Sequence, residues 1–339
     1  MQDENQVNQM KIEEIRSICV GYHIIKKLGK GIYSVVKLGQ KGHQLVAIKF
    51  LKIQNEQWPK IIQKLQQEVQ ILQQLNNNKH PRIIQLITYS DNFTYKKKNG
   101  QIVYKIGMIL ELGEKGTMIS YLLTLKRFDE QTSKFYFRQL MTALIYMKGL
   151  NICHLDLKPD NIVFDSDFNL KICRIWIFQI SKWPYKRLLW RNRIIAYDGS
   201  KVDVFAAAQI LFKMITGQFA FNNCKEQLYN LIKQNDYAQF WNIQNKQHQT
   251  LFPQGFPDDF KDLINKMIDP DFNRRITPEE CLQHPWTMGV EANNVQERIN
   301  QQLKQQEEEY QRQQQMRRDQ ERADQEMRNL LQQSQQSYK

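Results

Sequence analysis

The sequence predicts an α+β protein in which a small β-rich half precedes a larger helical half and a polar tail. Residues 22–112 contain short alternating apolar runs separated by Gly-containing turns, as strands do. Beyond Gly116, apolar residues recur every three or four positions, which is the period of a helix. After Met288, Gln, Glu and Arg dominate the composition. These changes divide the chain into an N-terminal arm (residues 1–20), a folded domain (residues 21–287) and a helical or disordered tail (residues 288–339).

The β-rich half contains three short strand patterns, one helix and one hairpin. Strands are predicted over residues 23–25, 34–38 and 45–49. The dipeptide Asn99-Gly100 separates two apolar runs, residues 93–95 and 102–112, and this arrangement is a strong hairpin signal. Between the third strand and the hairpin, residues 60–75 predict the one main helix of this half.

The helical half is predicted from an apolar stripe and from its prolines. The stripe consists of Phe135, Phe137, Leu140, Leu144 and Met147, whose spacing is typical of a buried helix. A second apolar run covers residues 202–214, and Pro270, Pro278 and Pro285 separate short helices near the end of the domain.

The tail has one short apolar face, formed by Val295, Ile299 and Leu303. Glu308 and Arg312 are four residues apart, a spacing that supports an isolated helix by a few tenths of a kcal/mol. No heptad seam is sustained, so the indication of a coiled coil is weak. Two interpretations stay open: a solvated, partly helical segment, or a docking or dimerising helix.

Charge and composition limit the partners. The net charge is +13, with residues 1–20 contributing −2 and residues 290–339 contributing −1, so the middle of the chain carries about +16. Such a field favours anionic partners such as ATP, acidic peptides or nucleic acid. No run of 18 apolar residues is present, so we expect no membrane partner. The acidic, polar start is unlike a secretory signal, and the five cysteines are scattered, so we expect the cytoplasm or the nucleus.

Three motifs identify the family. The octet His154-Leu155-Asp156-Leu157-Lys158-Pro159-Asp160-Asn161 is the most specific one. It is preceded by the Gly-containing segment 28–36 and by Val46-Ala47-Ile48-Lys49. Together these motifs resemble the catalytic loop, the Gly-rich loop and the Val-Ala-Ile-Lys strand of eukaryotic protein kinases. The resemblance runs from about Tyr22 to Trp286 and is closest to the Ser/Thr type, in the calcium/calmodulin-kinase-like branch.

The resemblance implies the bilobal protein kinase fold, with a β-rich N-lobe and a helical C-lobe, and it implies ATP and Mg²⁺ as cofactors. It assigns Asp156 as the catalytic base, Lys158 as the residue that steadies the transferring phosphoryl group, Asn161 as a metal ligand and Lys49 as the phosphate-binding lysine. It assigns nucleotide binding to Leu28, Gly29, Lys30, Gly31, Ser34, Val36, Ala47, Lys49, Glu68, Glu111, Gly113 and Val163.

One block departs from the family. Arg174-Ile175-Trp176 stands where protein kinases have Asp-Phe-Gly, and the lost aspartate is the principal Mg²⁺ ligand. The Ala-Pro-Glu that closes the activation segment is also missing, with Leu188-Leu189-Trp190 at the corresponding place. Arg275 is therefore expected to lack the glutamate that it normally pairs with. These departures from the family pattern form one continuous block, from about Cys173 to Ala196.

Three explanations of this block stay open. In the first, the chain is a pseudokinase, a binding or scaffold module, in which Arg174 either pairs with ATP phosphates or folds onto Asp156 or Glu68. In the second, residual activity persists with one metal. In the third, the chain is an active Ser/Thr kinase that transfers the γ-phosphate of ATP to protein, and residues 173–196 result from a gene-model or frameshift error. Codons AGA ATT TGG ATT for residues 174–177 would give Glu-Phe-Gly when read one base later.

A fourth, non-kinase interpretation concerns residues 182–193. Basic and aromatic residues alternate in this run, as they do in proteins that bind single-stranded nucleic acid. A degenerate activation segment accounts for the same residues without a nucleic-acid partner, and we expect none.

Overall fold

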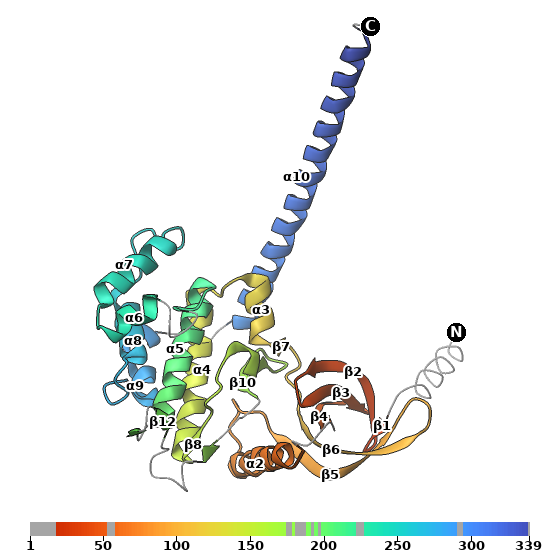
Figure 1. Cartoon of the computed structure of the whole chain (residues 1–339), viewed down its shortest axis with the longest axis vertical. Coiled ribbons are helices and arrows are strands. Elements are labelled where there is room, and N and C mark those ends of the chain that lie inside the picture. The colour runs from red at the N-terminus through yellow and green to blue at the C-terminus, as the bar shows by residue number, and fades with distance from the viewer. Residues whose placement is uncertain are drawn as a thin grey trace.

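The computed structural model describes residues 18–52, 58–173, 178–179, 188–190, 193–195, 198–221, 227–289 and 294–337. Figure 1 shows a β-rich lobe (red to orange), a helical lobe (yellow to blue) and one long helix that leaves the body of the molecule. This arrangement confirms the bilobal α+β fold that the sequence predicts.

The N-terminal lobe is a closed six-stranded barrel with the order β1-β2-β3-β4-β6-β5. Its strands are β1 (Ile18–Cys19), β2 (Tyr22–Lys30), β3 (Ser34–Lys41), β4 (Gln44–Leu51), β5 (Leu86–Lys96) and β6 (Ile102–Glu111). The hairpin at Asn99-Gly100 is confirmed, and Gly100 adopts the positive φ (83°) that such a turn requires. Strand β1 closes the barrel because it pairs with both β2 and β5. The sheet thus begins inside the predicted arm (residues 1–20). The sequence did not predict this strand, because two residues are too few to show a periodic pattern.

Two separate groups of apolar side chains hold this lobe together. One lies inside the barrel and includes Val46, Ile48 and Phe50 of β4. The other belongs to the main core, where helix α2 (Trp58–Asn77) packs through residues such as Leu72 and shares a cluster with Met108 of β6. Side chains alternate along a strand, so β4 directs odd-numbered Lys49 away from its even-numbered neighbours Ile48 and Phe50.

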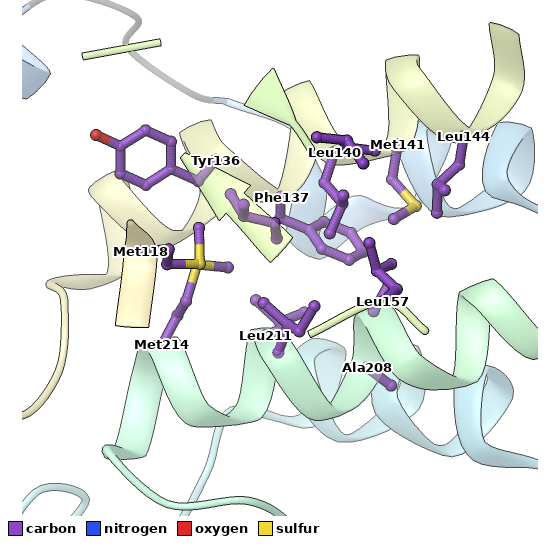
Figure 2. Packing of buried hydrophobic residues seen from close by; sticks show 14 of the residues in the cluster. Met118, Tyr136, Phe137, Leu140, Met141, Leu144, Leu157, Ala208, Leu211 and Met214 are labelled. Carbon is purple, nitrogen blue, oxygen red and sulfur yellow. The ribbon is translucent and has the colours of Figure 1, made fainter. Parts of the chain in front are cut away.

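The helical lobe is built around α4 (Glu130–Gly149) and α5 (Gly199–Thr216), whose facing side chains Figure 2 shows. Both helices start at an aspartate whose side chain accepts a backbone N–H, Asp129 from Thr132 and Asp198 from Ser200. The apolar stripe predicted between residues 135 and 147 lies on α4. The remaining helices are α3 (Met118–Leu125), α6 (Gln227–Lys233), α7 (Tyr237–Gln247), α8 (Asp258–Ile268), α9 (Pro278–Gln283) and the 3-10 turns η1 (Pro159–Asn161) and η3 (Pro285–Thr287).

Short strands connect these helices to the barrel. They are β7 (Gly116–Thr117), β8 (Ile152–Cys153), β9 (Ile162–Phe164), β10 (Leu170–Ile172), β11 (Phe178–Gln179), β12 (Leu188–Trp190) and β13 (Arg193–Ile195). The strands β7, β9 and β10 form one small sheet, and β12 pairs with β13 as a separate hairpin. Val163 of β9 and Lys171 of β10, which are described below, lie on the first of these sheets.

The tail forms the single helix α10 (Val295–Ser337), which has 43 residues and is therefore roughly 65 Å long. Its first turns belong to the domain: Val295 and Ile299 are buried, and Arg298 Nη1 lies 3.7 Å from Asp129 Oδ1. Farther along, Tyr310 is 53% exposed, and Figure 1 shows the helix extending away from both lobes. Within the described residues, every helix is too short or too polar to cross a membrane.

Candidate active site

Val36, Ala47 and Lys49, three of the predicted nucleotide-binding residues, lie on one face of the barrel. Val36 of β3 is the cross-strand partner of Lys49 on β4. Ala47 lies two residues before Lys49 on the same strand and is the partner of Leu110 on β6. Cross-strand partners share a face, as do alternate residues of a strand. The barrel thus presents two small apolar side chains and one ammonium group on the side opposite its own interior.

Lys49 is held by Glu68 of α2. Its Nζ donates to both carboxylate oxygens of Glu68, at 2.7 Å to Oε1 and 2.6 Å to Oε2. The two side chains are only 13% and 16% exposed, so solvent screens this pair less than a surface pair. The contact fixes α2 against β4 and holds the lysine in one position, as a phosphate-binding lysine requires.

The Gly-rich turn lies between β2 and β3. The amide of Gly31 donates to the carbonyl of Ser34 (2.9 Å), and the ammonium of Lys52 donates to the carbonyl of Gly31. A Cβ added at Gly31 would lie 3.4 Å from Ser34 Oγ, a tight contact. Serine therefore fits beside Gly31 at the position where the resemblance predicts a third glycine. On the approach to this turn, Leu28 and Lys30 are exposed and Gly29 is partly buried.

The segment after β6 approaches β9 closely. A Cβ added at Gly113 would lie 2.4 Å from Cγ2 of Val163, so only glycine allows this approach without displacing Val163. The carboxylate of Glu111 accepts from Lys171 Nζ at 2.7 Å and from the amide of Gln85 at 3.2 Å. Sequence reasoning missed the pair between Glu111 and Lys171, which is far apart along the chain and has no local signal. It joins β6 to β10, the strand that leads to Cys173.

Asp156, Lys158 and Asn161 come together at η1. Lys158 Nζ lies 3.0 Å from the carboxylate of Asp156. The side-chain amide of Asn161 donates to the backbone carbonyl of Asp156 at 2.7 Å and to its Oδ2 at 3.0 Å. Asp156 is 42% exposed, so the carboxylate that is predicted as the base remains accessible from solvent.

A buried carboxylate positions this loop. Asp203 of α5 accepts from the amides of His154 (2.6 Å) and Leu155 (2.8 Å). Leu155 has a φ of 61°, in the left-handed region that costs a non-Gly residue about 1–2 kcal/mol. The two hydrogen bonds that the backbone amides donate to Asp203 offset that cost and hold the backbone that precedes Asp156.

Asp203→Asn should lower the free energy of unfolding by about 1–3 kcal/mol. The carboxamide has one donor group where Asp203 has two acceptors, so one of the buried amides of His154 and Leu155 loses its partner. Urea denaturation would measure the effect. Asp198→Asn is the matched control, because asparagine caps a helix as well as aspartate does. Equal effects of the two substitutions would contradict the assigned role of Asp203.

The same variant should change the pH dependence of stability. Burial lowers the pKa of His154 from 6.5 to about 4, so its contribution is present above pH 6.5 and is lost as the pH falls through 4. Burial raises the pKa of Asp203 from 3.8 to about 7, so its contribution is greatest below pH 3.8 and is lost as the pH rises through 7. Between pH 4 and 6.5, a rise in pH increases the contribution of His154 to the free energy of unfolding and decreases that of Asp203, so the two effects oppose each other in the wild-type chain. In Asp203→Asn only the effect of His154 remains. Acidification from pH 6.5 to 4 should therefore lower the free energy of unfolding of the variant more steeply than that of the wild type.

One side-chain oxygen is available at the predicted Mg²⁺ site. Asn161 Oδ1 is buried and lacks a hydrogen-bond partner, so one oxygen ligand is available. Within the described part of the chain, however, no group of three or more His, Cys, Asp or Glu side chains could hold a metal ion. Mg²⁺ favours carboxylates together with phosphate oxygens, and the sequence has Arg174 where the family has its carboxylate. The carboxylate that the family places at this site is therefore missing from the sequence.

Arg275, which was expected to lack its usual glutamate, has other partners in the described residues. Its guanidinium donates to the carbonyl of Lys201 (2.7 Å) and, through Nε and Nη2, to the carbonyl of Asp269 (3.1 and 2.8 Å). It also lies 4.9 Å from the ring centroid of Phe205. Burial lowers the pKa of Arg275. Backbone carbonyls and an aromatic ring thus take the place of the expected glutamate.

The anomalous block is described only in part. Cys173 is described, and its amide donates to the carbonyl of Asn161 at 2.8 Å. Arg174, Ile175 and Trp176 lie outside the described residues, as do residues 180–187 and 191–192. At the place of the missing Ala-Pro-Glu, the backbone forms the hairpin of β12 and β13. Both interpretations of residues 182–193, a degenerate activation segment and a nucleic-acid-binding run, therefore stay predictions.

A family model described as "Protein kinase domain" matches residues 22–174 and 191–287. The chain belongs to the protein kinase family. The match covers both lobes of this kinase domain and is interrupted over residues 175–190, inside the anomalous block. Members of the family use ATP and Mg²⁺ and act on protein substrates.

Similar proteins are Ser/Thr kinases. The kinase domain is 31% identical over 290 residues to "Probable serine/threonine-protein kinase MARK-B" of Dictyostelium discoideum, covering 78% of this chain and 36% of that protein. It is 29% identical to the human "SNF-related serine/threonine-protein kinase", over 80% of this chain and 34% of that one. It is 26% identical to "CBL-interacting protein kinase 10" of rice, over 78% of this chain and 56% of that protein. The chain thus spans about a third of the first two relatives, and the Ser/Thr type that the sequence predicts is supported.

Proposed function

We propose that this protein kinase domain binds ATP without Mg²⁺ and works as a pseudokinase, a nucleotide-responsive binding module. The observation that carries the proposal is a contrast within one site. Lys49 and Glu68 form the ion pair that positions the phosphate-binding lysine, at 2.6 Å. The donor set for the metal is deficient, with Asn161 Oδ1 as the remaining oxygen and Arg174 at the position of the carboxylate.

Each part of ATP has a candidate partner. The apolar side chains of Val36, Ala47 and Val163 suit the adenine ring, and the backbone from Glu111 to Gly113 offers hydrogen bonds to its edge. Lys49 and the amides of the Gly-rich turn suit the phosphates. The close packing of Gly113 on Val163 supports this assignment, because it brings the segment after β6 next to an apolar side chain.

Arg174 is proposed to neutralise the phosphates in place of the metal. Its sequence neighbour Cys173 donates its backbone amide to the carbonyl of Asn161, the predicted metal ligand. The competing version, in which Arg174 closes the site on Asp156 or Glu68, has less support. Glu68 already binds Lys49 through both oxygens, and Asp156 already binds Lys158 and Asn161.

The chain should not transfer phosphate above background. Loss of a single oxyanion-stabilising donor lowers kcat by about 10²–10³, and loss of the principal metal ligand should cost at least as much. Incubation with γ-³²P-ATP, Mg²⁺ and a generic Ser/Thr substrate would measure transfer, with Asp156→Asn as the control. Equal incorporation by both proteins is the expected result. Incorporation by the wild type that Asp156→Asn abolishes would show residual activity and overturn the proposal.

One observation favours a second candidate function, an active Ser/Thr kinase. The family match is interrupted over residues 175–190 and resumes at 191, which is the pattern that a reading-frame error within residues 173–196 would leave. Sequencing of the transcript across Cys173 to Tyr197 would decide between the two functions. A transcript that encodes Arg174-Ile175-Trp176 supports the pseudokinase, and one that encodes an acidic residue followed by Phe-Gly supports the active kinase.

Helix α10 is proposed to be the docking element of the module. Its first turns are fixed to the domain by Val295 and Ile299, so a partner bound farther along would be held in a defined place. Removal of residues 304–339 should abolish co-purification of the partner from native extract while leaving the thermal stability of the domain unchanged. Retention of the partner by the truncated chain would place docking elsewhere.

A further inference from the structure

Two lysine side chains converge on one tyrosine in the barrel. Lys37 Nζ donates to Tyr95 Oη at 2.7 Å and lies 4.9 Å from the ring centroid. Lys105 Nζ lies 5.2 Å from the same centroid and 5.7 Å from that of Phe50. The tyrosine hydroxyl accepts from Lys37 and keeps its own O–H to donate. Three donor groups therefore meet at one place.

The strand register places this group on the interior face of the barrel. Lys37 is the cross-strand partner of Ile48, and Lys105 is the partner of Phe93. Ile48 and Phe93 both belong to the apolar cluster inside the barrel. Lys49 follows Ile48 on β4 and therefore points to the other face. The lysine cluster thus lies on the interior face of the barrel wall, and the proposed nucleotide site lies on its outer face.

The lysines of this cluster have no carboxylate partner among the described ion pairs. Residues 18–51 contain six lysines and no aspartate or glutamate, and of these Lys49 is paired with Glu68 of α2. Lys27 is the direct cross-strand partner of Lys37, and like charges in this relation are destabilising. Among the ion pairs of the described residues, none includes Lys27, Lys37 or Lys105.

The nearby thiol of Cys19 does not supply the missing negative charge. Cys19 is completely buried, and burial raises the pKa of its thiol to about 11, although Lys105 and Lys37 act in the opposite direction. The thiol is therefore neutral near pH 7. Aromatic faces attract the two ammonium groups, but they leave both formal charges in place.

We propose that Lys37, Lys105 and the hydroxyl of Tyr95 form a second anion site, which binds a phosphate group. Phosphate carries a charge of about −1.5 to −2 at pH 7 and has three strong acceptor oxygens, which match two ammonium groups and three donors. A carboxylate would leave one positive charge unpaired. Because this site lies on the barrel interior, it binds independently of ATP.

A local spectroscopic measurement tests the site. The chain is labelled with ¹³C-tyrosine, the ring signals of Tyr95 are assigned by comparison with Tyr95→Phe, and inorganic phosphate is titrated at constant ionic strength against sodium chloride. The same titration is made in the Lys49→Met background, which removes phosphate binding at the nucleotide site. The expected result in both backgrounds is a saturable shift of the Tyr95 signals that chloride does not produce.

Substitutions then separate the site from general charge effects. Lys37→Met and Lys105→Met keep the aliphatic stems and should each weaken binding about tenfold or more, and the double variant should lose the saturable shift. Lys41→Met is the matched control, because Lys41 lies 5.9 Å over the ring of Tyr22, outside this cluster, and it should keep normal binding. A shift that is linear, equal in chloride or preserved in the double variant would overturn the proposal. A separate titration with O-phosphoserine would show whether an esterified phosphate also fits.

Discussion

Arg174→Asp should weaken ATP binding in EDTA by about 100-fold or more and should make binding depend on Mg²⁺. The substitution changes the local charge by two units, and at an effective dielectric constant of about 20 each unit charge at 4 Å is worth about 4 kcal/mol. Half of one such interaction, about 2 kcal/mol, is already more than the roughly 1.4 kcal/mol that corresponds to a tenfold change in affinity. Aspartate would also restore the carboxylate that, together with Asn161, binds the metal in the family. Isothermal titration calorimetry with ATP would measure both effects.

The control for Arg174→Asp is Arg317→Asp. Arg317 is an exposed residue of α10, and its replacement changes the net charge of the chain by the same amount. We expect ATP binding by this variant to be unchanged in EDTA and in Mg²⁺. If Arg174→Asp binds ATP as tightly in EDTA as the wild type does, Arg174 does not act in place of the metal.

Lys49→Met should reduce ATP affinity to below the limit of calorimetric detection. The substitution removes the ammonium group that Glu68 positions, and it leaves the carboxylate of Glu68 without its partner at a place that is only 16% exposed. An unpaired, poorly solvated carboxylate would also repel the phosphates. Thermal unfolding with increasing ATP would check the result independently, because a ligand raises the unfolding temperature only when it binds the folded chain.

Two further variants grade this effect. Glu68→Gln keeps an oxygen that accepts from Lys49 and removes the negative charge, so it should weaken ATP binding less than Lys49→Met does. Lys60→Met removes an exposed lysine from the first turn of α2 and should have no effect. An order of effects in which Lys60→Met is as harmful as Lys49→Met would contradict a specific role for the Lys49–Glu68 pair.

The sequence was sufficient for the architecture wherever a motif or a period extends over many residues. The helix at residues 60–75, the hairpin at Asn99-Gly100 and the apolar stripe of α4 all have signals of this length, and the structure has each of them. Lys49 and Glu68 were both assigned to nucleotide binding from the resemblance to the family alone. Their ion pair, at 2.6 Å, could come only from the folded chain.

The features that the sequence did not predict depend on tertiary contacts. Strand β1 is two residues long and exists because β2 and β5 both offer it partners. Lys171 binds Glu111 across the two lobes, and no local pattern relates the two residues. The sequence indicated that Arg275 lacks its usual glutamate, but it gave no sign of the carbonyls of Lys201 and Asp269 that accept from it in the folded chain.

Isothermal titration calorimetry of the wild-type chain with ATP, in EDTA and again in excess Mg²⁺, distinguishes metal-free from metal-dependent binding. We expect saturable binding in EDTA, with an affinity that Mg²⁺ does not increase, because Arg174 and Lys49 together neutralise the phosphates. Absence of binding in EDTA together with tight binding in Mg²⁺ would show that the chain binds ATP through the metal and that Arg174 does not replace it.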